Sequence, residues 1–198
     1  SAGAGLLRGG AATRMGGDKG LRAQAIAMEN KLPDVHLIES AGANLFRQSE
    51  MFVKGGRGFA NLAKLSAAGI PVIGVTHGSS TAGGAYQSGL CDYLIVVRGR
   101  SKIFLAGPPL LKAATGEIAT DEELGGAEMH YFGPGTAEYL AEDDADGIRL
   151  CREVISKIGW NRECAISAPL TGSRPRYDPE EMLGIVPVDY RQPYDCRE

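Results

Sequence analysis

The apolar positions of this chain follow two periods in turn. Short apolar runs typical of buried strands predict strands at residues 34–39, 71–77 and 93–97, which read DVHLIE, PVIGVTH and YLIVV. Around them, apolar residues recur at helical spacing and predict helices over residues 19–30, 59–69, 85–92 and 143–158. Strands that alternate with helices pair in parallel through crossover connections, so the pattern predicts an α/β fold.

Signals at the ends of segments refine this prediction. Asp18 is a candidate N-cap for the first helix. The stretch SKIFLAGPPLLKAATGE predicts a short strand that leads into a helix with Pro108 and Pro109 in its first turn, where missing N–H groups cost little. DEELGG then predicts a helical turn. From residue 161 onward the chain is rich in proline and polar residues, which predicts a linker or surface arm.

Paired glycines stand at or near the ends of the periodic segments. The pairs are at residues 9–10, 16–17, 55–56, 83–84 and 125–126. Because glycine adopts turn conformations that other residues avoid, the pairs predict turns of a compact α/β fold.

Composition narrows the classes of function. The formal net charge of -3 comes from 21 basic and 24 acidic residues that are well mixed, so neither nucleic acid nor a membrane surface is an expected partner. The apolar runs are all shorter than a membrane span. The four cysteines are widely spaced without a CxxC pair, which predicts no metal site and no disulfide framework.

Two small-residue loops are the candidate functional site. SAGAN (residues 40–44) and TAGGA (residues 81–85) each follow a predicted strand at its carboxyl end, where open α/β sheets place ligands. Backbone N–H groups that converge on one oxygen can stabilise an enolate or a tetrahedral intermediate without a charged side chain. The alternative is that these glycines only let a helix pack closely on the sheet.

Longer motifs, spread along the chain, support a family resemblance. The blocks LRAQAIAMEN, ESAGAN, LSAAGIPVIGV, GSSTAGGAY, FLAGPPLLKAATGE and EELGGAEMH, with the ending DPEEMLGIVPVDYRQPYDCRE, resemble the carboxyltransferase β subunit of biotin-dependent acyl-CoA carboxylases. Their order and spacing cover nearly the whole chain. AGPPLLKAATGE is most similar to the methylcrotonyl-CoA and geranyl-CoA type.

The resemblance implies a crotonase-like fold of repeated ββα units and a reaction. The family moves a carboxyl group from carboxybiotin to an acyl-CoA enolate, with 3-methylcrotonyl-CoA or a similar thioester as the expected substrate. The biotin is carried by a partner α subunit, whose biotin carboxylase uses ATP and bicarbonate. The family also implies a homo-oligomer of β subunits, a hexamer, within an α/β complex. Such complexes are found in the bacterial cytoplasm or the mitochondrial matrix.

The resemblance also assigns site residues. Gly83 and Gly84 match the glycines that hold the thioester oxygen, and Gly42 and Ala43 match the donors of the companion loop. Acyl-CoA contacts are expected from residues that flank the glycine pair and from basic residues near the start of the first helix: Ala82, Ala85, Arg14, Lys19 and Arg22. For the three basic residues, a solvated basic face is an equally good interpretation.

Two departures from the family pattern stand out. Many relatives have SGGA where this chain has Ala41 in SAGA, which stiffens that loop slightly. The family subunit has two homologous halves, the first for acyl-CoA and the second for biotin. Residues 1–160 are expected to form the acyl-CoA half, incomplete at its start, and residues 161–198 a linker toward a missing second half. The sequence is therefore expected to be a fragment.

Other functions remain as alternatives. A crotonase-type enoyl-CoA hydratase or isomerase would need carboxylates at the active loops, and only the upstream Glu39 is near them. A non-catalytic CoA-binding module is the third possibility. A serine nucleophile at Ser79 or Ser80 beside His77 is disfavoured because the spacing does not suit a Ser-His-Asp system. His130 and His36 are expected to make structural hydrogen bonds.

Overall fold

The computed structural model describes residues 13–43, 48–160, 178–189 and 191–194. Its contacts divide the chain into two units, Ser1–Trp160 and Asn161–Glu198. The second unit contains the 3-10 helix η3 (Pro179–Glu181) and the helix α8 (Met182–Ile185). The linker predicted to begin at residue 161 falls mostly outside the described residues. The functional roles expected for the two ranges stay predictions.

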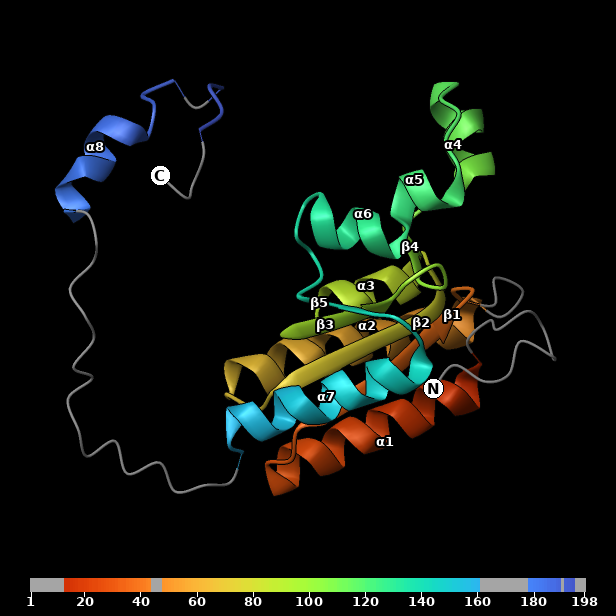
Figure 1. Cartoon of the computed structure of the whole chain (residues 1–198). Coiled ribbons are helices and arrows are strands. Elements are labelled where there is room, and N and C mark those ends of the chain that lie inside the picture. The colour runs from red at the N-terminus through yellow and green to blue at the C-terminus, as the bar shows by residue number, and fades with distance from the viewer. Residues whose placement is uncertain (1–12, 44–47, 161–177, 190, 195–198) are drawn as a thin grey trace. The chain divides into compact units, whose positions relative to one another are not determined.

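The first unit is built on a parallel sheet, as the alternating pattern predicted (Figure 1). Its strands are β1 (Asp34–Ser40), β2 (Val72–Thr81), β3 (Tyr93–Val97), β4 (Lys102–Phe104) and β5 (Tyr139–Ala141). The main order of the strands is β1-β2-β3-β5. The strand β4 lies outside this order and pairs with the carboxyl end of β2, past the part of β2 that pairs with β3. Every strand pair is parallel, so the carboxyl ends of β1 and β2 lie at the same edge.

Helices cover both faces of this sheet (Figure 1). They are α1 (Arg14–Asn30), α2 (Gln48–Ala67), α3 (Gly83–Gly89), α4 (Pro108–Thr115), α5 (Asp121–Gly125), α6 (Ala127–Phe132) and α7 (Asp144–Ile158). Alternate residues of β3 separate two core layers: Ile95 and Val97 pack with α7, whereas Leu94 and Val96 pack with Ala85 of α3 and Ala127 of α6. The helix α3 therefore lies on the face opposite α7.

A third apolar layer connects α1 and α2 to the sheet. Leu62 and Leu65 of α2, Ala27 of α1 and Val72 of β2 are buried together. Beside this layer, the buried Gln24 of α1 donates its amide N–H to the carbonyl of Gly58 at 3.2 Å and accepts a hydrogen bond from Asn61. The two helices are thus joined by apolar packing and by a part-buried amide cluster.

A bulge bends the carboxyl end of β2. Ile38 of β1 pairs with Thr76, and Ser40 pairs with Ser80, so two steps along β1 correspond to four along β2. Extra residues of this kind sharpen the local bend of a strand and redirect the next segment of the chain. The bulge directs the end of β2 toward the turn that leads into α3.

Several sequence predictions are wrong in detail. The first helix begins at Arg14, and its N-cap is Thr13 and not Asp18, because the Thr13 hydroxyl accepts from the Gly16 N–H at 3.2 Å. The second helix begins eleven residues earlier than the apolar pattern indicated. Two glycine pairs predicted to form turns lie inside helices, Gly16 and Gly17 in α1 and Gly55 and Gly56 in α2. The second strand continues through Thr81.

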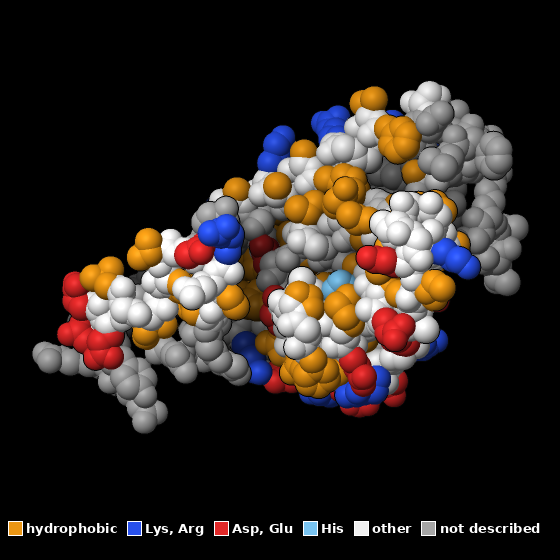
Figure 2. Space-filling view, turned by 90° about the horizontal axis from the view of Figure 1, so that it is seen from above, with side chains coloured by type: hydrophobic (Ala, Val, Ile, Leu, Met, Phe, Trp, Pro, Cys, Tyr) orange, Lys and Arg blue, Asp and Glu red, His pale blue; other side chains and the backbone are white. Residues whose placement is uncertain are grey.

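One part of the unit exposes apolar surface. No residue of α4 is buried, and Leu105, Leu110 and Ile118 in and beside it are largely exposed. Figure 2 looks down on the side that carries α4, α5 and α6 and shows hydrophobic side chains at the surface there. Among the described helices, none combines the length and apolar character needed to cross a membrane.

Candidate functional site

The two small-residue loops meet at the carboxyl edge of the sheet. Gly42 adopts φ +85°, and a Cβ placed there would stand 3.3 Å from the Thr81 carbonyl oxygen and 3.5 Å from the Ala82 Cβ. The loop after β1 therefore touches the turn after β2. This contact brings together the two segments that sequence analysis selected, which lie about 40 residues apart in the chain.

The turn between β2 and α3 has a strained backbone at Ala82. Its φ of 53° and ψ of -115° lie in a region that residues with a Cβ rarely adopt. The Ala82 N–H donates to the Phe104 carbonyl of β4 at 3.1 Å, and the Ala82 carbonyl accepts from Ala85 at 3.0 Å. Such strain persists only where the surrounding structure enforces it, and it is concentrated at functional sites.

The first two residues of α3 are packed very differently. A Cβ on Gly84 would meet the Ser40 Cβ at 3.0 Å and the Ser80 Oγ at 3.1 Å, so the helix backbone rests directly on both strands. A Cβ on Gly83 would have an ordinary contact of 3.7 Å with Phe59 of α2. No side chain caps this end of the helix. Its backbone N–H groups are the donors that an oxyanion would need.

The companion loop differs from its predicted role in one respect. The Gly42 N–H donates to the Ser40 Oγ at 3.1 Å in a buried hydrogen bond, so this hydrogen is directed into the protein. Ala43 lies in an isolated β-bridge. The assignment of these two residues as oxyanion donors stays a prediction.

The residues expected to contact acyl-CoA fall into three places. Ala82 is exposed at the turn, whereas the Ala85 side chain is only 8% exposed and packs in the core beneath it. Arg14, Lys19 and Arg22 are exposed on α1, and Arg22 lies 4.0 Å from Glu29. The side chain of Ala85 therefore packs in the core next to the turn and does not face the surface.

The carboxylate nearest to the loops points away from them. Ser40 faces α3, since it contacts the position of Gly84, and side chains of a strand alternate between faces. Glu39 accordingly lies on the other face, where its carboxylate is next to Gly78. The strand β1 therefore does not supply this turn with the carboxylates that a hydratase would need.

The geometry does not support Ser80 as a nucleophile, whereas Ser79 is exposed and its role is untested. Ser80 is fully buried, and its hydroxyl is hydrogen-bonded to Ser88 at 3.3 Å. A nucleophile must reach a substrate and be activated by a neighbouring base, and Ser80 can do neither from this position. Among the described residues, no group of three or more His, Cys, Asp or Glu side chains is placed to hold a metal ion.

Two histidines have structural hydrogen bonds, as predicted. His36 bonds Asp34 through Nε2 at 2.8 Å and the Gln87 amide nitrogen through Nδ1 at 2.7 Å. His130 bonds the Ile103 carbonyl through Nε2 at 2.8 Å and the Thr136 hydroxyl through Nδ1 at 2.6 Å. Both rings use both nitrogens within the protein. The His36 contact additionally attaches α3 to β1.

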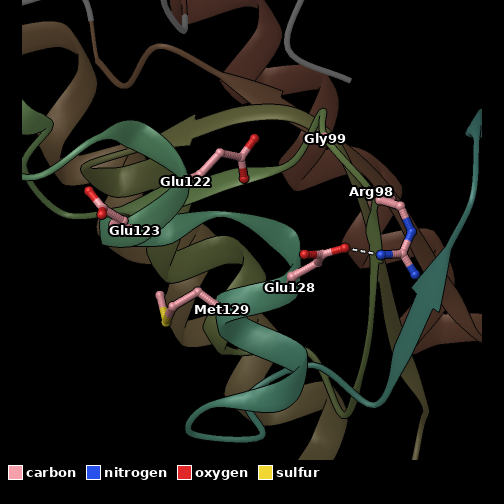
Figure 3. A pocket seen from close by; sticks show the side chains of 6 residues that line it. All are labelled: Arg98, Gly99, Glu122, Glu123, Glu128 and Met129. Atoms are coloured by element: carbon pink, nitrogen blue, oxygen red, sulfur yellow. Dashed lines mark hydrogen bonds and ion pairs between the residues drawn. The ribbon is translucent and has the colours of Figure 1, made fainter.

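An open depression elsewhere on the unit is lined by charged residues (Figure 3). Its lining residues are Arg98, Gly99, Glu122, Glu123, Glu128 and Met129. Glu128 points toward Arg98 and forms an ion pair with it, and Glu122 pairs with Lys102. None of these residues belongs to the two loops, so the depression is separate from the candidate site.

Cys91 is expected to resist alkylation. Burial, reinforced by nearby carboxylates, raises the pKa of its thiol to about 12. Only the thiolate reacts with iodoacetamide, and a shift of about three pKa units lowers the thiolate population about a thousandfold. Peptide mass spectrometry after iodoacetamide treatment at pH 8 should show Cys91 modified in urea and protected in the folded chain. Rapid labelling of folded protein would contradict the raised pKa of this partly buried thiol.

Comparisons with known proteins identify the family of the chain. The family model for the carboxyl transferase domain matches residues 6–198. A probable biotin-dependent acyl-coenzyme A carboxylase beta2 subunit from Mycobacterium tuberculosis is 51% identical over 178 residues, covering 90% of this chain and 33% of that protein. The mitochondrial methylcrotonoyl-CoA carboxylase beta chain of Dictyostelium discoideum is 47% identical, covering 91% of this chain and 31% of that protein.

Solved structures show the same relationship. The beta subunit of P. aeruginosa geranyl-CoA carboxylase has 57% sequence identity and a TM-score of 0.73, with 98% of this chain and 36% of that chain covered. The transcarboxylase 12S hexamer, solved with hydrolysed methylmalonyl-coenzyme A bound, has 28% identity and a TM-score of 0.74 over 98% of this chain and 38% of that one.

The fold is the crotonase-like fold of the carboxyltransferases to which the chain is similar. The chain belongs to the carboxyl transferase domain family, whose members include the beta subunits of biotin-dependent acyl-CoA carboxylases. It spans about a third of the length of the curated relatives that it matches. The family resemblance seen in the sequence is confirmed.

Proposed function

We propose that this chain forms the acyl-CoA half of a carboxyltransferase site in a biotin-dependent acyl-CoA carboxylase. The observation that carries the proposal is the contact between the loop at Gly42 and the strained turn at Ala82, which places the start of α3 beside a second small-residue loop. An enolate of an acyl-CoA carries its negative charge on the thioester oxygen. Backbone N–H groups at Gly83 and Gly84 would stabilise that charge without a charged side chain.

The described residues fit an acyl-CoA thioester at this turn. A Cβ added at Gly83 would stand 3.7 Å from the Phe59 ring, so only the absence of a side chain leaves the backbone open at this position. Ala82 presents only a methyl group. Arg14, Lys19 and Arg22 on α1 are proposed to bind the phosphates of CoA, since exposed cations favour such groups.

Carboxybiotin, carried by a partner α subunit, would supply the carboxyl group that is transferred. Among the described residues we assign none to biotin, and the biotin half of the site is proposed to come from a second homologous half of the full-length protein. The residues of this chain would hold the thioester, polarise its carbonyl through backbone donors and keep the acyl carbon oriented. ATP and bicarbonate would be consumed on the partner.

The proposed substrate is 3-methylcrotonyl-CoA or a similar unsaturated acyl-CoA. Relatives named for methylcrotonoyl-CoA and geranyl-CoA support this choice with 47% and 57% identity, against 30% for a relative named for acetyl- and propionyl-coenzyme A. The assembly is proposed to contain a hexamer of β subunits, as in the transcarboxylase 12S structure. Its proposed location is the bacterial cytoplasm or the mitochondrial matrix.

The test is a carboxylation assay on the full-length chain that contains this segment, co-produced with its biotin-bearing partner. We expect ATP-dependent incorporation of labelled bicarbonate into 3-methylcrotonyl-CoA or geranyl-CoA in preference to propionyl-CoA, and loss of incorporation when avidin is added. Turnover of an enoyl-CoA without biotin would support the hydratase alternative instead. Binding of CoA without turnover would leave a CoA-binding module.

A further inference from the structure

Three buried hydroxyl groups form a cluster beneath the turn that begins α3. Thr76, Ser80 and Ser88 have at most 1% of their surface exposed. The Ser88 hydroxyl bonds the Thr76 hydroxyl at 2.9 Å and the Ser80 hydroxyl at 3.3 Å. A buried hydroxyl is less favourable than an apolar group of the same size unless it is hydrogen-bonded. The cluster therefore does more than fill space, because alanine or valine would do that without the penalty.

In a regular β-strand, the two hydrogen-bond partners of Ser88 would be far apart. Residues four positions apart are separated by about 13 Å at the usual rise of a β-strand. Here Thr76 and Ser80 both lie within hydrogen-bond distance of one Ser88 oxygen. They can do so because the bulge in β2 falls between them, where the pairing with β1 shifts from Ile38 to Ser40. The Ser88 hydroxyl thus bridges the two sides of the bulge.

The bulge and α3 together set the position of the candidate site. Ser80 is followed by Thr81 and by the strained Ala82, and Gly84 rests on Ser80 and Ser40. A displacement of Ser80 would therefore move the backbone of both loops. Ser88 is in the same seven-residue helix as Gly83 and Gly84. Its two hydrogen bonds therefore also fix the distance of that helix from the sheet and its rotation about its own axis.

We propose that Ser88 is a positioning residue for carboxyl transfer. Its hydroxyl holds the bulged end of β2 and the start of α3 in the arrangement that directs the Gly83 and Gly84 N–H groups at the thioester oxygen. The proposal rests on the function proposed above. Ser88 does not touch the substrate, because it is buried beneath the turn.

The helix has a second attachment that keeps it in place without Ser88. The neighbouring Gln87 donates to His36 of β1 at 2.7 Å, and this contact involves none of the three hydroxyls. Loss of the Ser88 hydroxyl is thus expected to shift α3 without detaching it. The consequence should appear in the rate of the chemical step and much less in substrate binding.

The test uses the full-length chain assembled with its biotin-bearing partner. We expect Ser88→Ala to lower kcat for acyl-CoA carboxylation about ten- to a hundredfold, since small misplacements of reacting groups have effects of this size. KM for the acyl-CoA should change by less than about threefold. Ser80→Ala removes only the longer of the two bonds and should give a smaller loss of kcat.

Ser101 provides the matched control. It is as completely buried as Ser88, and its hydroxyl bonds the Val97 N–H and the Thr76 carbonyl, so these two hydrogen bonds join β3 to β2 and involve no residue of α3. Ser101→Ala should lower stability and leave kcat unchanged.

The proposal is overturned if Ser88→Ala keeps wild-type kcat, or if both variants lose kcat in proportion to their loss of stability. If Ser88→Ala does not fold, wild-type kcat in Ser80→Ala overturns it. Absence of carboxylation by the wild-type assembly would instead refute the proposed function.

Discussion

Gly84→Ala is expected to abolish most carboxyltransferase activity and to destabilise the fold. The added Cβ would stand 3.0 Å from the Ser40 Cβ and 3.1 Å from the Ser80 hydroxyl. Ser80 cannot turn aside without losing its bond to Ser88. Overpacking of this kind costs about 1–3 kcal/mol, which exceeds the gain of up to about 1 kcal/mol from replacing a helical glycine. Because α3 would be displaced from the sheet, kcat should fall about a hundredfold or more.

Two other glycines of the same helix serve as controls. A Cβ on Gly89 would have nothing within 4 Å, so Gly89→Ala should retain both stability and kcat. A Cβ on Gly83 would meet only Phe59 at 3.7 Å, so Gly83→Ala should fold normally. It should nevertheless lower kcat, because a methyl group beside the proposed backbone donors would hinder the approach of the thioester. Urea denaturation and steady-state kinetics of the three variants separate packing from catalysis. Wild-type stability and activity in Gly84→Ala would contradict the close packing of α3.

Gly125→Ala is expected to have the largest effect on stability. Its Cβ would stand 2.3 Å from the Ile103 carbonyl oxygen and 2.8 Å from the Phe104 ring, and backbone cannot move aside as a flexible side chain can. The same carbonyl accepts a hydrogen bond from His130. We therefore expect a loss of more than about 3 kcal/mol in the free energy of unfolding, since both close contact and a lost hydrogen bond contribute.

The effect should extend to the candidate site. Phe104 of β4 accepts the N–H of Ala82, so displacement of β4 removes a support of the strained turn. Gly56→Ala is the control: it lies inside α2 with nothing within 4 Å of a new Cβ, and it should gain about 0.5–1 kcal/mol. Thermal and urea unfolding of both variants give the comparison. Equal stability of Gly125→Ala and the wild type would mean that α5 does not pack on β4 in this way.

The sequence predicted well those elements whose local signals are strong. The strand at Tyr93–Val97 has the predicted bounds, and α7 lies between Asp143, which caps it, and Gly159, as its apolar stripe indicated. The start of α2 was missed because Gly55 and Gly56 resemble a turn, although nothing approaches them closely. The elements α6 and β5 were missed because six and three residues are too few to show a period.

The candidate site was predicted only in part for a related reason. Small residues after two strands were visible in the sequence, and parallel pairing placed their carboxyl ends together. The bulge in β2 was not visible, because it depends on pairing with β1. Ser88 carries no distinguishing signal in the sequence, and only its burial against Thr76 and Ser80 distinguishes it. Nor could the sequence show that the Gly42 N–H bonds Ser40.

The strained turn at Ala82 has a consequence for how the protein forms on the ribosome. A backbone conformation of this kind costs about 1–3 kcal/mol, so the segment around Ala82 does not adopt it alone. One hydrogen bond that supports it comes from Phe104, and β4 is itself held by an antiparallel bridge between Lys102 and Gly126. The nascent chain must therefore emerge at least as far as residue 126 before the turn gains this support. The candidate site is therefore expected to become ordered only after this later segment has been synthesised.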